Sequence, residues 1–348
     1  MLKISPMTYS FDQLQNDWHP IAIESTLVIN APTPISLLGQ SLVLWRDEQL
    51  QIHLWLDQCP HRGMKLSLGT IQNNRLVCPY HGWQFNATGK CSFIPSLPHL
   101  LEDNLKAQVK KFKVQVKYGL VWACLGEPIS DFFLFPEFDM AQRRIVYCGP
   151  YDINTSGPRI IENFLDMAHF PFVHEGTLGD KNHMDIPDYL VEEFSDEIYG
   201  HVIRATQCFS WQPQSSKKSD QAELIEYAYR VVHPFSAILN KKSNNSNFNL
   251  DGLDDVISLH IQPIEPTITR AWIIMALGDF EHSDQELREF QDFIFLQDKS
   301  ILENQTPKLL PLHPETEISV VSDRLSIAYR KYLRTNNLQY GVMNSSIL

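Results

Sequence analysis

Residues 59 to 83 read CPHRGMKLSLGTIQNNRLVCPYHGW and contain two short loops, each with one cysteine and one histidine. Cys59 and His61 form one pair, Cys78 and His81 form the other, and sixteen residues separate the two pairs. Two thiolates and two imidazoles can bind zinc, but a zinc finger usually takes both cysteines from one loop and both histidines from a helix. The mixed order favours a 2Fe–2S cluster in which the cysteines bind one iron and the histidines the other.

The residues that flank these four candidate ligands suit the same cluster. Pro60, Gly63, Pro79 and Gly82 permit tight turns whose N–H groups can approach bridging sulfides, and Trp83 can shield the cluster from water. Neutral imidazole ligands raise the reduction potential relative to an all-cysteine cluster. The other cysteines are expected to be core residues: Cys91, Cys124, Cys148 and Cys208.

Composition indicates a globular enzyme and excludes several other classes. The chain has 348 residues, enough for two domains, and 43% of them are hydrophobic. A net charge of −12 argues against a nucleic-acid partner, which requires clustered Lys and Arg. We find no apolar run long enough to span a membrane and no apolar signal segment at the N-terminus. Six irregularly spaced cysteines indicate reduced thiols, so we expect a cytoplasmic location without disulfides.

Hydrophobic patterning separates an all-β part, residues 15–130, from a mixed part, residues 131–348. Residues 35–59 alternate apolar and polar side chains and are interrupted at Gly39 and at Asp47, which is typical of hairpins. In the mixed part we expect a helix over 159–169, directly after Pro158, another with a capping box at Ser283, and a last helix over 322–334. Strands are predicted over 201–211, 222–232, 255–264 and 269–277, and exposed loops over 215–220 and 241–252.

A second candidate site begins in ENFLDMAHFPFVHEG, residues 162–176. Asp166 and His169 are three residues apart, so on a helix they share one face. His169 and His174 would diverge on an ideal helix, but Pro171 between them disturbs it and lets the second histidine turn toward the first. Two such histidines could equally be core residues, so a metal site requires a further ligand.

The helix over residues 283–305 offers that ligand. The neighbours three and four positions before and after Asp298 are all apolar: Ile294, Phe295, Ile301 and Leu302. Asp298 therefore points inward, whereas Asp292 lies at a boundary and Glu303 on a solvated face. A lone buried carboxylate is costly unless a cation such as a ferrous ion pairs with it. Two histidines and one carboxylate form the facial triad of non-haem Fe(II) oxygenases, which leaves coordination positions open.

With both sites in place, the chain resembles the oxygenase component of Rieske non-haem iron oxygenases over nearly its full length. Four segments carry the resemblance in order and spacing: CPHRG-to-CPYHGW, NFLDMAHFPFVHEGTLGD, LQDKSILENQTP and SDRLSIAYRKYL. It is similar to the short, single-chain group with vanillate O-demethylase, dicamba monooxygenase, caffeine N-demethylases and saxitoxin-pathway hydroxylases. This implies an α+β fold with an all-β Rieske 2Fe–2S domain and a helix-grip, antiparallel-sheet catalytic domain on which residues 1–14 pack.

The resemblance also implies roles for individual residues. Four match the cluster ligands and three match the iron ligands: Cys59, His61, Cys78 and His81 for the 2Fe–2S cluster, and His169, His174 and Asp298 for the mononuclear Fe(II). Asn163 matches a residue near the iron. Asp166 matches a carboxylate that bridges, across a subunit boundary of a homotrimer, from a cluster histidine such as His81 to an iron-bound histidine. Relatives often have Glu-Asp where this chain has Gln297-Asp298, so the charge beside the ligand differs.

The implied activity is a monooxygenase that hydroxylates a C–H bond of a small organic substrate. Electrons come from an NAD(P)H-dependent flavin and iron–sulfur reductase or a ferredoxin, and one atom of O2 enters the product. Hydroxylation of a methyl on nitrogen or oxygen leads to demethylation. The alternatives are cis-dihydroxylation of an aromatic ring and a non-catalytic Rieske electron carrier fused to a ligand-binding domain. Pocket walls are expected from Leu165, Phe170, the strands after residue 200 and the loop over 241–252.

Overall fold

The structure is a computed structural model that describes residues 14–129, 131–196, 200–217, 219, 221–243 and 255–344. The chain divides into two compact units between residues 131 and 132. The expectation that residues 1–14 pack on the second unit concerns a segment that lies outside the described residues except for residue 14. None of the described helices is long and apolar enough to cross a membrane.

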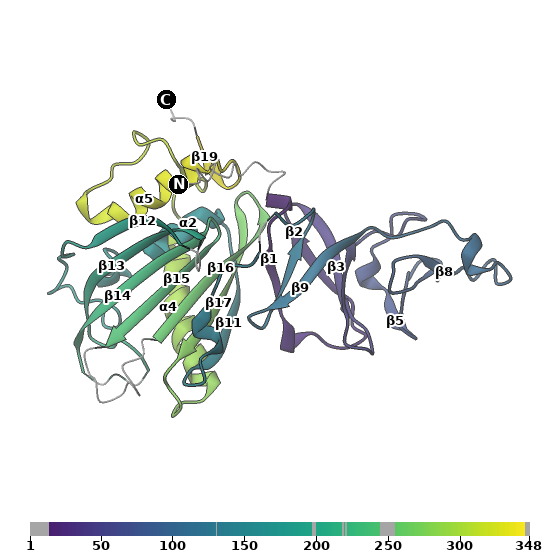
Figure 1. The fold of residues 1–348 in the computed structure, drawn as a ribbon, viewed down its shortest axis with the longest axis horizontal. Helices are drawn as coiled ribbons and strands as arrows, with labels where there is room; N and C mark the ends of the chain where they lie inside the picture. The colour runs from purple at the N-terminus through teal and green to yellow at the C-terminus, as the bar shows by residue number, and fades with distance from the viewer. Residues whose placement is uncertain are drawn as a thin grey trace. The chain divides into compact units, whose positions relative to one another are not determined.

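The first unit contains two antiparallel sheets (Figure 1). A six-stranded sheet has the order β1-β10-β9-β4-β3-β2, with β1 His19–Ile23, β2 Thr33–Leu37, β3 Gln40–Arg46, β4 Ile52–Leu56, β9 Lys111–Lys117 and β10 Leu120–Cys124. A four-stranded sheet contains β5 Thr70–Gln72, β6 Arg75–Val77, β7 Gln84–Phe85 and β8 Cys91–Phe93 in sequence order. The predicted hairpins are confirmed: β2 and β3 pair across a turn at Leu38 and Gly39, whose φ angles are 49° and 74°.

The core of this unit packs around two tryptophans. Trp45 and Trp55 meet edge to face at 5.1 Å and are each 1% exposed. Cys59 and Cys78 belong to the same buried cluster, although each lies in a loop directly after a strand, β4 and β6 respectively. The packed sheets therefore fix the starting point of both cysteine–histidine loops.

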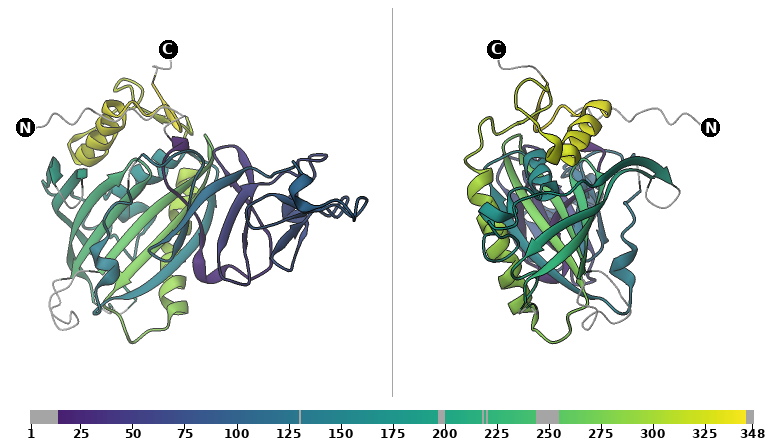
Figure 2. Two further views of the ribbon diagram at one scale, coloured as in Figure 1. Left: turned by 45° about the vertical axis from the view of Figure 1, so that its right-hand side comes forward. Right: turned by 90° about the vertical axis from the view of Figure 1, so that its left-hand side faces the viewer.

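The second unit is built on a seven-stranded antiparallel sheet with helices on one face, as predicted (Figure 2). The sheet order is β11-β17-β16-β15-β14-β13-β12, with β11 Arg144–Ile153, β12 Leu190–Asp196, β13 Gly200–Gln212, β14 Glu223–His233, β15 Ser236–Ser243, β16 Asp255–Glu265 and β17 Ile268–Leu277. The helices are α2 Gly157–Leu165, α3 Phe170–Val173, α4 Asp284–Leu302 and α5 Arg324–Thr335, and the short parallel strands β18 Leu310–Pro311 and β19 Val342–Met343 pair with each other.

Helix α4 packs along β11, and contacts near both of its ends set its direction. The capping box predicted at its start is present, because the Ser283 hydroxyl accepts from the Glu286 N–H and the Glu286 side chain accepts from the Ser283 N–H. Arg144 at the start of β11 pairs with Asp284 at 2.5 Å, and the Tyr151 ring stacks on Phe295 at 4.1 Å. The first turn of α4 therefore lies near the end of β17, which pairs with the start of β11.

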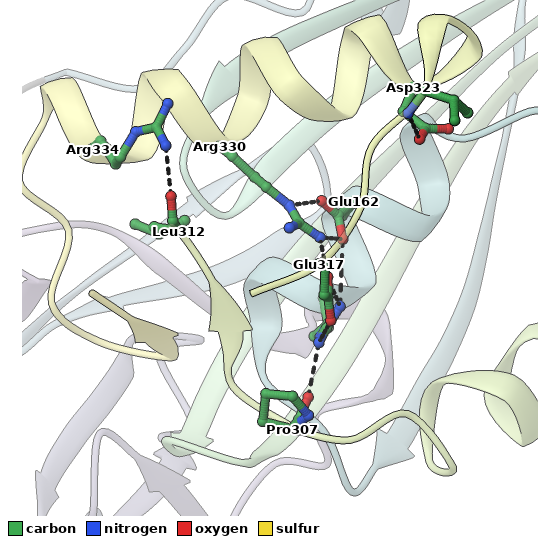
Figure 3. Close-up of polar contacts among 9 residues, drawn as sticks. Glu162, Pro307, Leu312, Glu317, Asp323, Arg330 and Arg334 are labelled. Carbon is green, nitrogen blue, oxygen red and sulfur yellow. Dashed lines mark hydrogen bonds and ion pairs between the residues drawn. The ribbon is translucent and has the colours of Figure 1, made fainter. Parts of the chain in front are cut away.

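Helices α2 and α5 are joined by a partly buried ion-pair network (Figure 3). Arg330 on α5 donates to Glu162 on α2 at 2.5 and 2.9 Å and to Glu317 at 2.6 Å. Arg159 on α2 donates to the same Glu317 at 2.5 Å and to the Pro307 carbonyl at 2.9 Å. This network fixes α2, the helix that leads into the histidine-containing segment.

Three sequence predictions in this unit are wrong. The helix predicted through His169 ends at Leu165, and Asp166 is its C-cap with extended φ and ψ of −90° and 139°. Pro171 does not disturb a helix but lies in the first turn of α3, where a missing N–H has no consequence. The predicted loop over 241–252 begins too early, because residues 241–243 pair with β14 as the end of β15; residues 244–252 lie outside the described residues.

Candidate metal centres

The two cysteine–histidine loops of the first unit have the same backbone geometry. In each, the glycine N–H donates to the cysteine carbonyl: Gly63 to Cys59 at 2.9 Å and Gly82 to Cys78 at 3.0 Å. Both glycines have positive φ, 73° and 70°, a conformation that a side chain disfavours. The glycines of the motif are therefore required by the turns, and the two loops present their ligands in matched fashion.

The four predicted cluster ligands lie together. The Cys59 and Cys78 thiols are neighbours and are each 2% exposed. The rings of His61 and His81 lie 4.7 Å apart, and Trp83 stacks on His61 at 4.3 Å with nearly parallel planes. The histidines lie toward the surface, because His81 is exposed and Tyr80, which contacts it at 3.8 Å, is 61% exposed. The thiols are thus inside and an imidazole edge is outside.

The chemistry of these donors fits an iron–sulfur cluster. Burial raises the pKa of the Cys59 thiol to about 11, although the backbone N–H of His61 faces its sulfur, and the nearby Cys78 raises the pKa further. Two adjacent buried thiolates require positive charge, which bound iron supplies. Nδ1 of His61 is a buried polar atom with no hydrogen-bond partner among the residues that the structure describes. Such an unpaired nitrogen beside buried sulfur ligands is the pattern that a metal ligand leaves.

In the second unit, the short helix α3 separates two histidines. His169 is its N-cap and His174 its C-cap, and the Val173 N–H donates to the His169 carbonyl at 2.8 Å. Because α3 is a single turn, both rings reach the same point beside α4, where Asp298 faces inward with 9% exposure. The structure thus brings together all three residues of the predicted triad.

Their donor atoms form a nearly equilateral triangle. The Nε2 atoms of His169 and His174 lie 3.2 Å apart, and Asp298 Oδ1 lies 3.3 Å from the first and 3.2 Å from the second. With metal–donor bonds of about 2.1 Å, ligands at right angles lie about 3 Å apart. The triangle therefore has the dimensions of one face of an octahedron.

Neighbouring acceptors orient both imidazoles. Asp166 Oδ2 lies 2.9 Å from His169 Nδ1, and Gln297 Oε1 lies 2.8 Å from His174 Nδ1. Each Nδ1 then carries the proton, so each neutral ring directs its Nε2 lone pair into the triangle, where the Asp298 carboxylate oxygen also points. Three electron-rich atoms at this separation repel one another unless a cation lies between them, so the residues fit a mononuclear iron.

The pKa values of His169 and Asp298 also indicate that the triad favours a positive charge. Burial alone lowers the pKa of His169, but hydrogen bonds to Asp166 and Asp298 raise it to about 9. Burial alone raises the pKa of Asp298, but His169 and His174 hold it near 2. The carboxylates thus favour a cation at this point, whether an imidazolium or a metal ion.

Two further residues differ in how well the sequence predicted them. Asn163, expected near the iron, lies on α2 with its Nδ2 3.4 Å from Asp298 Oδ1. Gln297 was noted only as the loss of an acid, whereas its side-chain oxygen is the acceptor that orients His174. The available signal was that Gln297 directly precedes the ligand Asp298. Adjacent residues of a helix point about 100° apart, however, so the sequence gave no reason to expect Gln297 to contact His174.

A cavity of about 200 Å³ opens at the triad. Its walls are mostly apolar and aromatic and include Phe164, Phe170, Tyr227, Tyr229, Leu259 and Phe295. Phe170 and the strands after residue 200 therefore contribute as predicted. Leu165 is buried at 1% exposure and is not among the residues that line the cavity. Lys241, from the misplaced loop, lines the cavity as part of β15.

Comparison with known proteins agrees with both centres. The family described as "Vanillate O-demethylase oxygenase C-terminal domain" matches residues 153–336, and "Rieske [2Fe-2S] domain" matches residues 17–113. The chain belongs to the Rieske non-haem iron oxygenases. It is 34% identical to methylxanthine N1-demethylase NdmA of Pseudomonas putida, over 93% of this chain and 89% of that protein.

Two other similarities support the same family. The probable methylxanthine N7-demethylase NdmC of a Pseudomonas strain is 42% identical over 64% of this chain and 77% of its own length. The structure of P. putida NdmA with caffeine superposes with a TM-score of 0.75 at 28% identity, covering 96% of both chains. This Rieske oxygenase is therefore the oxygenase component of a monooxygenase, an oxidoreductase that uses O2 with a 2Fe–2S cluster and a mononuclear iron.

Proposed function

We propose that this Rieske oxygenase removes a methyl group from nitrogen or oxygen of a small, flat ring compound, and that an N-methylated heterocycle such as a methylxanthine is the substrate class. The observation that carries the proposal is that the triad lies in the wall of an apolar cavity with aromatic sides. Similarity to two methylxanthine demethylases supports the choice of substrate.

In this proposal the cluster ligands are Cys59, His61, Cys78 and His81, and the iron ligands are His169, His174 and Asp298. When bound, the two iron centres supply the stored electron and the activation of O2 that C–H hydroxylation requires. Asp166 and Gln297 keep the two imidazoles in the tautomer whose Nε2 can bind metal. Asn163 lies against the Asp298 oxygen and limits its movement.

The cavity walls bind and orient the substrate. Phe170 and Tyr227 meet edge to face at 6.0 Å, and Phe164 and Tyr229 do so at 6.3 Å, so flat faces border the triad. Gln212 donates to the Tyr227 hydroxyl at 2.6 Å and fixes that ring. A flat ligand between these walls excludes water and places one methyl at the triad.

The proposal includes the assembly and its location. A separate NAD(P)H-dependent reductase or ferredoxin supplies electrons at the exposed edge near His81, and the chain forms a homotrimer in the cytoplasm. The surface position of His81 and Tyr80 supports docking of another protein there. Six free thiols support a reducing compartment. In the trimer, Asp166 connects His169 to a cluster histidine of the neighbouring subunit, for which its 28% exposed side chain is accessible.

The test combines iron analysis with turnover. Purified, reconstituted protein is mixed with a surrogate Rieske reductase, NADH, O2 and a panel of methylxanthines, methoxybenzoates and methylated amines. We expect three irons per chain and one formaldehyde per NADH consumed with at least one methylated heterocycle.

The competing functions have different outcomes in the same experiment. Two irons per chain and no turnover would identify an electron carrier with a ligand-binding domain. Two atoms from ¹⁸O-labelled O2 in one product would identify a dihydroxylating dioxygenase. A mass measurement that shows a monomer at all working concentrations would exclude the homotrimer and the bridge through Asp166.

A further inference from the structure

The cavity at the triad has a second, charged end. Lys241 on β15 lines the cavity, as do Asp255 at the start of β16 and Glu223 at the start of β14. Lys241 and Asp255 are directly opposed across the two strands. Asp255 accepts the Gly278 N–H at 2.8 Å, which places this cluster at the end of β17. Asp279 and the exposed Lys217 line the cavity as well, and most of the remaining lining is apolar, so charged groups gather at one end.

This charged end lies far from the metal donors. Helix α4 begins beside the end of β17, and Leu287 in its first turns lines the cavity there, whereas Asp298 is eleven residues later. Eleven residues of helix span about 16 Å. A lysine side chain reaches about 6 Å from its Cα. With the lysine extended toward the triad, roughly 10 Å remains between the ammonium and the triad for a ligand and its contacts, which suits a molecule of one or two fused rings.

Lys241 has charge compensation but no direct partner. No hydrogen bond or ion pair joins its ammonium to any other residue that the structure describes. Asp255 and Glu223 act on it only through the longer-range field, and each has another donor: Gly278 for Asp255, and the Ser215 hydroxyl at 2.5 Å for Glu223. The two carboxylates balance the positive charge while the ammonium hydrogens remain available to a ligand.

The surroundings make such an unused donor costly. Burial lowers the pKa of Lys241 to about 8, and Asp255 and Glu223 only partly oppose this effect. A buried donor without an acceptor costs free energy that a ligand with a suitably placed oxygen recovers. Because nearby carboxylates already neutralise the charge, a neutral carbonyl oxygen suits the site better than another anion.

We propose that Lys241 is a specificity-determining residue that donates a hydrogen bond to a carbonyl oxygen of the substrate, at the end of the cavity opposite the iron. The inference deepens the proposed function and rests on it, because it concerns the same cavity. It selects rings with an oxo group about one ring-length from the oxidised methyl over equally flat, oxygen-free rings. A site that hydrogen-bonds a substrate group discriminates strongly against analogues lacking it.

The experiment measures binding of matched probes by calorimetry to iron-loaded protein. Caffeine is compared with the carbonyl-free 9-methylpurine, and 4-methoxybenzoate with 4-methoxytoluene. The variants are Lys241→Met, which keeps the length of the side chain, and Lys242→Met as control. Lys242 is the next residue on the same strand, with a 56% exposed side chain and a distant contact to Glu226 at 3.9 Å.

We expect Lys241→Met to weaken caffeine binding at least about tenfold and 9-methylpurine binding less than twofold, with Lys242→Met unchanged for both. The proposal is overturned if Lys241→Met binds both members of each pair as the wild type does, if it weakens both members equally, or if the wild type prefers the oxygen-free probes. Selective loss of 4-methoxybenzoate alone overturns the neutral carbonyl in favour of a carboxylate. Failure of the demethylation proposal is seen separately, as absence of formaldehyde from probes that bind.

Discussion

The two candidate centres use histidine in opposite settings. The cysteine–histidine loops of the first unit hold their thiols inside and an imidazole edge outside, and all four ligands come from 23 residues of sequence. The triad of the second unit is largely buried, at the two ends of α3 and on α4, and Asp298 lies 124 positions after His174 in the sequence. The first geometry suits exchange of electrons with another protein, whereas the second suits a reaction from which water is excluded.

The largest effect is expected from removing the distant ligand. Asp298→Ala should release the mononuclear iron and lower turnover on the order of a thousandfold, because metal chemistry contributes several kcal/mol. The visible spectrum of the cluster should remain, since the first centre is built independently. Iron analysis and NADH-coupled turnover check this. Glu289→Ala, an exposed acid on the same helix, is the control. Full iron content with full turnover in Asp298→Ala would remove Asp298 from the site.

A smaller effect is expected from the carboxylate that connects to His169. Asp166→Asn should keep both metals but slow turnover about 10- to 100-fold. The amide oxygen can still accept the hydrogen bond from His169 Nδ1–H, but it carries no negative charge. Single-turnover oxidation of the reduced cluster checks this. Asp180→Asn is a matched control, because Asp180 binds His183 at the same spacing and the same 2.9 Å on the surface. Equal rates in both variants would contradict a role for Asp166.

Substitution of Gln297 tests whether the acceptor of the His174 Nδ1–H contributes to iron retention as the Asp166 carboxylate does for His169. Gln297→Leu leaves His174 Nδ1 without its 2.8 Å acceptor, so we expect iron to dissociate about tenfold faster into a chelator. Gln297→Glu restores an acceptor and should retain iron at least as well as the wild type. If Gln297→Leu loses iron no faster than the wild type, His174 is oriented by packing alone.

Stability of the second unit should depend on the network between α2 and α5. Arg330→Met removes one of the two arginines that pair with both Glu162 and Glu317 and is expected to lower the free energy of unfolding by about 3 kcal/mol. Urea unfolding followed by circular dichroism measures the change. Lys331→Met, which breaks an exposed pair between α5 and Glu193, should cost less than about 1 kcal/mol. Equal midpoints for the two variants would show that the network contributes little.

The smallest expected effect is a change in stability at acidic pH that depends on Glu317. Burial raises the pKa of Glu317, but hydrogen bonds from Arg159 and Arg330 outweigh it and hold the pKa below the ordinary 4.5. A lowered carboxylate pKa adds stability that is present above the unfolded value and is lost as pH falls through the folded value. The stability difference between the wild type and Glu317→Gln should therefore be largest near neutral pH and shrink below about pH 4.5. A difference that does not change with pH would contradict this.

The sequence predicted the first centre better than the second for a physical reason. Ligands, turn glycines and strand ends of the cysteine–histidine loops are local, so spacing alone contains the geometry. Asp298 was also predictable from the sequence, because helical periodicity placed it on a buried stripe of the helix. The end of α2 at Leu165 and the one-turn helix α3 depend on packing that no local pattern reveals, so the prediction of a continuous helix through His169 was wrong.

Polar residues inside the cavity were the hardest to predict. Lys241 lies in KKSNNSN, which is typical of an exposed loop, yet pairing with β14 and β16 turns it inward. The contact of Gln297 with His174 depends on how α4 lies against α3, which is a tertiary property. Charged residues on strand ends become predictable only once the register of the sheet is known.

The network through Arg330 makes the last helix a support for residues that lie more than 150 positions earlier. Any shortened version of this protein that ends before α5 would leave Glu162 and Glu317, beside the iron-binding segment, with one arginine, Arg159, in place of two. A deletion far from the metal in the sequence should then reduce how much iron the purified protein retains. The last helix is therefore needed in any version of the protein that is expressed for iron analysis.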